Sequence, residues 1–324
     1  MAAAAVLPPS APAASPPFLV HDVGAGYYEP QSQYSIAAGQ SSLAGWVLAL
    51  HPASLRAFLW RPEDGERISL PDMSQDFPPN CKCVLSGNPA AGGSSCAVMV
   101  LDLDEPEYWL CFVGGANKWE RHVYTFTMYD DEDQPVERHM ARRHGVAAVG
   151  GKVYFEFTGN ELGFVEFDAT GGEPSYGMID VDMVDIPERF PLWSSYLVES
   201  RGELFLAVVF FDGPNVHKVA EVAVYRMDFS APAAWRKVDG IGGDRVFLLG
   251  GDRIGVSNFG ASCAADAERG LNGNRIYFLN HIAINENFLH VIDLEKGTEE
   301  VRRPFQEFVD PLCPPFWMLP ASSI

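Results

Sequence analysis

The sequence predicts an all-β protein built as a single β-propeller, for which we expect six blades, with five or seven as alternatives. Its 324 residues contain many short apolar or aromatic runs closed by Gly, Asp or Asn, a pattern typical of β-strands joined by tight turns. These runs follow one another at intervals of about 8 to 12 residues, as in sandwiches, barrels and propeller blades. Runs that are apolar throughout, such as 96–101, indicate burial on both faces, which stacked blades provide. We expect strands from the two chain ends to pair and close the ring.

The predicted strands fall into successive units. A short strand over 33–37 comes first, and the units then follow in order along the chain. They are 45–50, 56–62 and 67–71; 83–86, 96–101, 108–113 and 118–121; 146–149, 152–157 and 163–168; 195–199, 203–211, 220–227 and 235–238; and 245–250, 254–257, 275–279, 288–294 and 299–302. The repeat spacing is irregular, so the units repeat in structure more than in sequence. We therefore expect domain bounds of 33–320 for the propeller, with a disordered Ala/Pro-rich tail over 1–32 and a short tail over 321–324.

Charge and cysteine content limit the function classes. The chain has 43 acidic and 23 basic residues, a net charge of −20, and such a surface repels phosphate backbones and anionic lipids. We expect no nucleic-acid or membrane partner, and a protein partner with a basic patch is favoured. The acidic run 130–133 beside the basic run 138–143 is typical of a solvated loop. Six irregularly spaced cysteines, without a signal peptide, indicate free thiols in the cytoplasm or nucleus.

No stretch of the sequence shows a catalytic constellation. The run 255–260 has one residue too many for the Gly-x-Ser-x-Gly nucleophile motif, and His139 and His144 lack the spacing of a metal-binding pair. We expect no catalytic residue, no metal, no cofactor and a monomeric chain. Phe190 and Trp193 differ from the other large aromatics because they lie in a loop beside prolines. Aromatics in loops on a rigid scaffold are candidates for a partner-binding hot spot.

Several motifs occur in an order that resembles the plant KIB-type (kink-suppressor) β-propeller family, formerly a plant domain of unknown function. The motifs are Ala57-Phe58-Leu59-Trp60-Arg61-Pro62, Gly151-Lys152-Val153-Tyr154, Leu197-Val198-Glu199-Ser200-Arg201-Gly202, Val246-Phe247-Leu248-Leu249-Gly250 and Trp317-Met318-Leu319-Pro320. The resemblance spans about 44–320. It implies a propeller that binds other proteins, often behind an F-box that recruits a Skp1-cullin ubiquitin ligase. Five prolines up to Pro17 disfavour helices there, so we expect no F-box.

Two functional hypotheses follow. The first is a non-enzymatic protein-interaction module, in which one propeller face binds a partner protein, with a link to ubiquitin-ligase substrate recognition that the resemblance implies. The alternative is a hydrolase with an acidic site in the propeller channel, where the inner strands of every blade converge. The alternative depends on analogy with other propellers, and a cluster of carboxylates with perturbed pKa values in the channel would favour it.

Overall fold

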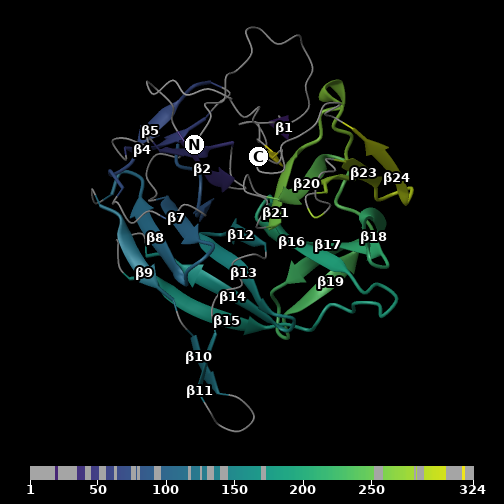
Figure 1. Ribbon diagram of the computed structural model, residues 1–324, viewed down its shortest axis with the longest axis horizontal. Coiled ribbons are helices and arrows are strands. Elements are labelled where there is room, and N and C mark those ends of the chain that lie inside the picture. The colour runs from purple at the N-terminus through teal and green to yellow at the C-terminus, as the bar shows by residue number, and fades with distance from the viewer. Residues whose placement is uncertain are drawn as a thin grey trace.

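The computed structural model contains a ring of β-sheets seen face-on in Figure 1. It describes residues 19–20, 35–40, 45–50, 56–61, 64–73, 78, 81–90, 96–115, 118–124, 126–129, 135–138, 145–168, 173–251, 258–280, 282, 288–303 and 316–317. Within these residues, four four-stranded sheets and one five-stranded sheet form the blades. The all-β propeller predicted from the sequence is therefore confirmed.

The blades follow one another in chain order. The first consists of β2 (Ser35–Gln40), β3 (Val47–Leu50), β4 (Ala57–Trp60) and β5 (Arg67–Ser69). The second consists of β6 (Cys81–Leu85), β7 (Ala97–Asp102), β8 (Glu107–Phe112) and β9 (Glu120–Val123). The third consists of β12 (Val146–Val149), β13 (Lys152–Thr158), β14 (Glu161–Glu166) and β15 (Ser175–Asp180). The fourth consists of β16 (Trp193–Ser200), β17 (Glu203–Asp212), β18 (Asn215–Asp228) and β19 (Ala234–Val238).

The fifth blade has an unusual strand order. It consists of β20 (Arg245–Gly251), β21 (Asn258–Ala264), β22 (Arg275–Leu279), β23 (Leu289–Asp293) and β24 (Thr298–Arg302), arranged β21-β20-β22-β23-β24. β20 therefore pairs antiparallel with β21 and parallel with β22. A short 3₁₀ helix, η1 (Ala267–Arg269), begins at the side-chain cap of Asp266 and ends at Gly270 in the left-handed region. This turn allows the chain to return from the inner strand β21 to β22.

The expectation of six blades is wrong: the structure has five, because the strands near the chain ends join the first and last blades and do not form a sixth. β2 is the first strand of the first blade, and β24 extends the last blade to five strands. The expected pairing of chain ends is present as a separate two-stranded sheet of β1 (Leu19–Val20) and β25 (Phe316–Trp317). Two residues of the predicted tail 1–32 thus belong to a strand, and the remainder of that tail, like 321–324, lies outside the described residues.

Apolar layers between adjacent blades hold the ring together. Every residue of β7 is buried, and β6 is buried along its whole length. Separate apolar clusters join the first blade to the second, the second to the third, the third to the fourth and the fourth to the fifth. The prediction that central strands are buried on both faces is confirmed. At about 25 cal/mol per Å² of apolar area, these layers are the main source of stability.

The inner strands approach one another closely. β16 and β21 contact each other at the centre of the ring, and a Cβ atom on Gly260 would lie 2.5 Å from the carbonyl oxygen of Leu197. A Cβ on Gly145, just before β12, would lie 2.4 Å from the backbone nitrogen of the same Leu197. Since real Cβ contacts are essentially never this short, glycine allows the three inner strands to pack backbone against backbone.

A hairpin projects from the ring between the second and third blades (Figure 1). It consists of β10 (Phe126–Tyr129) and β11 (Pro135–Arg138), paired antiparallel. The acidic run 130–133 and the histidines at 139 and 144 lie outside the described residues, as does the predicted strand 254–257. Within the residues that the structure describes, no helix is long and apolar enough to cross a membrane.

The five described cysteines are buried free thiols (Cys81, Cys83, Cys96, Cys111 and Cys263). Burial raises the pKa of Cys96 to about 11 and that of Cys263 to about 12. Because the thiolate is the reactive form, we expect none of the five to be alkylated by N-ethylmaleimide in the native protein at pH 7.5. Peptide mass spectrometry would measure this, with urea-unfolded protein as the positive control. Stoichiometric labelling of a described cysteine before unfolding would contradict the buried arrangement.

Candidate functional site

The inner strands define two ends of the propeller centre. Ser194 and Asn258 are hydrogen-bonded where β16 and β21 begin, and Ser200 and Ser262 are hydrogen-bonded near where they end. The two strands therefore run in the same direction. We call the side where they begin the entry end and the side where they finish the exit end. Polar side chains gather at both ends, so each end is a candidate site.

The entry-end cluster consists of Lys82, Glu156, Ser194, Ser195 and Asn258, which come from four different blades. The Lys82 ammonium donates to the backbone oxygen of Asn258 at 2.6 Å. The Asn258 amide donates to the Ser194 hydroxyl at 2.9 Å and to the Ser195 carbonyl at 2.7 Å. The Ser195 hydroxyl donates to a Glu156 carboxylate oxygen at 2.7 Å. These bonds connect the second, third, fourth and fifth blades at one point.

Glu156 reaches the cluster because β12 is short. The first residue of β12, Val146, pairs with Phe155, so Glu156 extends past the inner strand and lies beside Ser195. Burial raises the pKa of Glu156 to about 7, and the hydrogen bond from Ser195 opposes that shift only in part. Glu156 is therefore a group whose charge changes near neutral pH.

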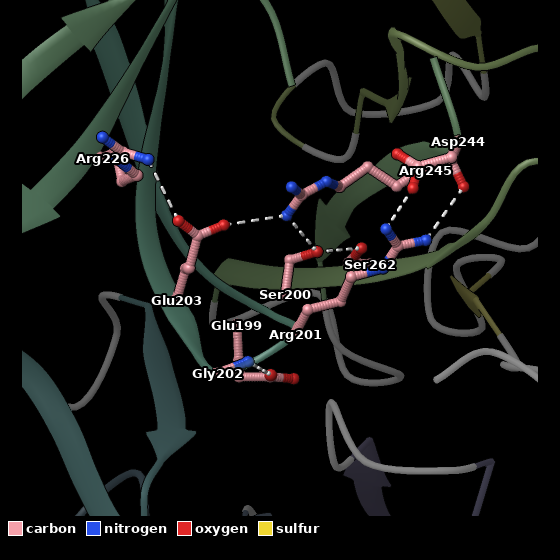
Figure 2. A network of polar contacts seen from close by, with 9 residues as sticks. All are labelled: Glu199, Ser200, Arg201, Gly202, Glu203, Arg226, Asp244, Arg245 and Ser262. Atoms are coloured by element: carbon pink, nitrogen blue, oxygen red, sulfur yellow. Dashed lines mark hydrogen bonds and ion pairs between the residues drawn. The ribbon is translucent and has the colours of Figure 1, made fainter. Parts of the chain in front are cut away.

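The exit-end network joins the fourth and fifth blades (Figure 2). Arg245 donates to the Ser200 hydroxyl at 3.0 Å and forms an ion pair with Glu203 at 3.3 Å. The Ser200 and Ser262 hydroxyls are 2.8 Å apart. Figure 2 also shows Arg201 extending across the blade boundary to form an ion pair with Asp244.

A small recess lies beside this network, with about 320 Å³ of empty space that is partly open to solvent. Its lining includes Glu199, whose carboxylate accepts the Gly202 backbone N–H at 2.9 Å and whose pKa is raised by burial. Arg201 and Gly202 have φ of 55° and 78° and form the two-residue turn between β16 and β17. Since the three guanidinium groups of the network, those of Arg201, Arg226 and Arg245, already have carboxylate partners, the exit end is best interpreted as a connection between blades.

The rim segment, residues 182–193, connects the outer strand β15 to the inner strand β16. Phe190 stacks on Phe210, with ring centroids 4.9 Å apart, and is partly buried. Trp193, the first residue of β16, is 44% exposed, and the preceding Leu192 is 39% exposed. The structure therefore places one sequence-based candidate, Phe190, in the packing between blades, and the other, Trp193, at the surface of the entry end.

The entry-end cluster is not among the sites predicted from the sequence, although the sequence contains a signal for it. Lys82 stands between two buried cysteines in β6, and Glu156 stands between two phenylalanines in β13. A charged residue within an apolar run needs a polar partner when the run is buried, which would have indicated a site. The partner itself could not be inferred, because Asn258 is 176 positions from Lys82 in the chain.

The five stacked sheets, with an exposed loop beside the inner strands, define a β-propeller. The model of the KIB1-4 β-propeller family matches residues 28–302, and the chain belongs to this family. The resemblance inferred from the ordered motifs is thus confirmed at the level of the family. No curated protein matches the sequence.

Solved structures with some likeness to the chain include three other proteins. BBS1N in complex with ARL6DN shares 10% identity, covering 92% of this chain and 76% of that chain with a TM-score of 0.34. Saccharomyces cerevisiae Sqt1 shares 9% identity over 85% of this chain and 86% of that chain, with a TM-score of 0.32. The Cps50 (Swd1) β-propeller domain of Myceliophteria thermophila shares 13% identity over 82% of each chain, with a TM-score of 0.27. Scores this low carry no information about partner or activity.

Proposed function

We propose that this protein is a non-enzymatic protein-interaction module that binds a partner protein through the entry end of the propeller. The observation that carries the proposal is the exposure of two consecutive large apolar residues, Leu192 and Trp193, at 39% and 44%, where the rim segment meets the inner strand. Exposed tryptophan on a rigid scaffold is the residue type most enriched among interface hot spots. β16 is otherwise buried, so its backbone holds the indole in place before a partner arrives.

The composition of the entry-end cluster also supports binding over catalysis. The alternative hydrolase requires several acids in the channel, and this cluster contains a single carboxyl group, that of Glu156. The adjacent Ser195 hydroxyl is in a residue that is only 2% exposed, so a substrate has little access to it. Hydrogen bonding to four blades gives these side chains a structural role in holding the entry end together.

Trp193→Ala is expected to weaken partner binding at least about thirty-fold, the loss typical of a hot spot worth about 2 kcal/mol. Affinity capture of the tagged protein from its native cells, followed by quantitative mass spectrometry, would measure the loss. Val301→Ala is the matched control, because Val301 is 50% exposed on β24 at the outer edge of the fifth blade. A partner recovered equally by the wild type and Trp193→Ala would contradict binding at the entry end.

A link to ubiquitin-ligase substrate recognition is a second part of the proposal, supported by the family to which the chain belongs. We expect the same capture to recover a Skp1-cullin component with the partner. If the partner is recovered and Trp193 is required for it, but no ligase component appears in any capture, the interaction module stands and the ligase link fails.

A further inference from the structure

We propose that the partner presents lysine or arginine side chains, interspersed with apolar ones, to the rim segment. This inference rests on the proposed function and specifies the chemistry of the partner. The observation behind it is that the acidic side chains of the rim segment have no ion-pair partner among the described residues, whereas the basic side chains around them do. An exposed surface that mixes free carboxylates with apolar side chains is complementary to a surface of basic and apolar side chains.

The acids of the rim segment are free, whereas the neighbouring bases are already paired. Asp182, Asp185 and Glu188 are exposed, and none of them forms an ion pair with another described residue. By contrast, Arg189 and Lys237 both lie within ion-pair distance of Glu221, at 2.8 and 4.0 Å. Lys218, on the same blade, pairs with Asp212 at 2.5 Å. The local excess of charge is therefore negative, as is the net charge of −20.

Packing of the apolar residues of the rim segment leaves Met183 and Asp185 on the exposed side. Val184, Ile186 and Phe190 are partly buried against the apolar cluster between the third and fourth blades. In an extended segment, alternate residues face opposite sides, so burying Val184 and Ile186 leaves Met183 and Asp185 exposed. Met183 is 67% exposed, so an apolar side chain is exposed between Asp182 and Asp185 in the sequence.

The backbone of the rim segment is held at both ends. Asp182 donates its N–H to the Ala233 carbonyl at 3.2 Å, beside β19, and the Leu192 carbonyl accepts the Phe211 N–H at 3.0 Å. A partner therefore meets a segment whose backbone is already tied down at both ends, which lowers the entropic cost of ordering it on binding. At the inner end, the exposed Trp193 indole provides a face on which a guanidinium can stack.

The inference is tested first with a defined probe. A fluorescein-labelled twelve-residue peptide with lysine at every third position and leucine between is titrated with the protein, and anisotropy is followed at low salt. The test variant is Asp182→Asn, Asp185→Asn, Glu188→Gln. The matched control is Asp239→Asn, Glu268→Gln, Glu295→Gln, which removes the same charge from exposed acids away from the rim segment. We expect about ten-fold weaker peptide binding for the rim variant and less than about two-fold for the control. Equal losses in both variants would overturn the inference, since binding would then follow net charge alone.

The natural partner separates this inference from the proposed function. Both variants and Trp193→Ala are used in the affinity capture described above. Loss of the partner with the rim variant and with Trp193→Ala, but not with the control, supports both proposals. Loss with Trp193→Ala alone means that the entry end binds a partner that is not basic, so the inference fails and the proposed function stands. Retention by Trp193→Ala and by the rim variant overturns both.

Discussion

Trp317→Ala is expected to lower the free energy of unfolding by about 3–5 kcal/mol, the loss usual when a buried tryptophan is truncated. Trp317 is 2% exposed and packs in an apolar cluster of the fifth blade. Its indole N–H donates to the Leu249 carbonyl of β20 at 2.8 Å. Its backbone pairs with Leu19 at the other end of the chain. One side chain therefore anchors the paired chain ends to the fifth blade, and truncation removes both the packing and the anchor.

Comparison with Trp317→Phe separates packing from hydrogen bonding. Phenylalanine retains most of the apolar volume and loses the indole donor, so we expect a smaller cost of about 1–2 kcal/mol. Urea unfolding followed by tryptophan fluorescence and circular dichroism would measure both variants, with the exposed Trp193→Ala as a control expected within about 0.5 kcal/mol of wild type. A midpoint unchanged by Trp317→Ala would show that the chain ends contribute nothing to the stability of the ring.

The propeller could be predicted from the sequence because strand and turn signals are local. Val246–Gly250 and Ile276–Leu279, for example, are apolar runs near turn residues, and both lie in observed strands of the fifth blade. The blade number could not be predicted in the same way, since it depends on which strand pairs with which. β22 pairs in parallel with β20 and does not start a sheet of its own. The strands that follow, β23 and β24, therefore belong to the fifth blade and not to a sixth. β21 lies between β20 and β22 in the chain, and the local hydrophobic pattern does not show that the chain passes over it to pair β22 with β20.

The candidate site was predictable only where a single residue was unusual in its own neighbourhood. Trp193 was identified because it follows a proline-rich loop, and the structure leaves it exposed. Phe190 had the same local sequence signal, but its stacking on Phe210 depends on a strand that follows later in the chain. The free carboxylates of the rim segment could not be recognised either, because their pairing depends on where Arg189 and Lys237 find Glu221. Exposure and charge pairing are tertiary properties.

Glu156→Gln is expected to stabilise the protein at pH 8 by about 2–3 kcal/mol and to change its stability little at pH 5. Burial raises the pKa of Glu156 from 4.5 to about 7, so the folded state binds the proton more tightly than the unfolded state. Stability contributed by this group is therefore full below about pH 4.5 and is lost as pH rises through about 7. Glutamine stays neutral at every pH and can still accept the hydrogen bond from Ser195. The variant thus avoids the cost of a buried charge above neutrality.

Urea midpoints between pH 5 and pH 8 would measure this difference, with Glu173→Gln as the matched control. Glu173 is an exposed carboxylate two residues before β15, and its removal is expected to change stability by less than about 0.5 kcal/mol at any pH. If Glu156→Gln were instead destabilising at pH 8, the ionised carboxylate would be serving as a needed partner of the Lys82 ammonium in the same cluster. The sign of the change at pH 8 therefore decides whether the entry end is more stable with Glu156 neutral or with its carboxylate ionised.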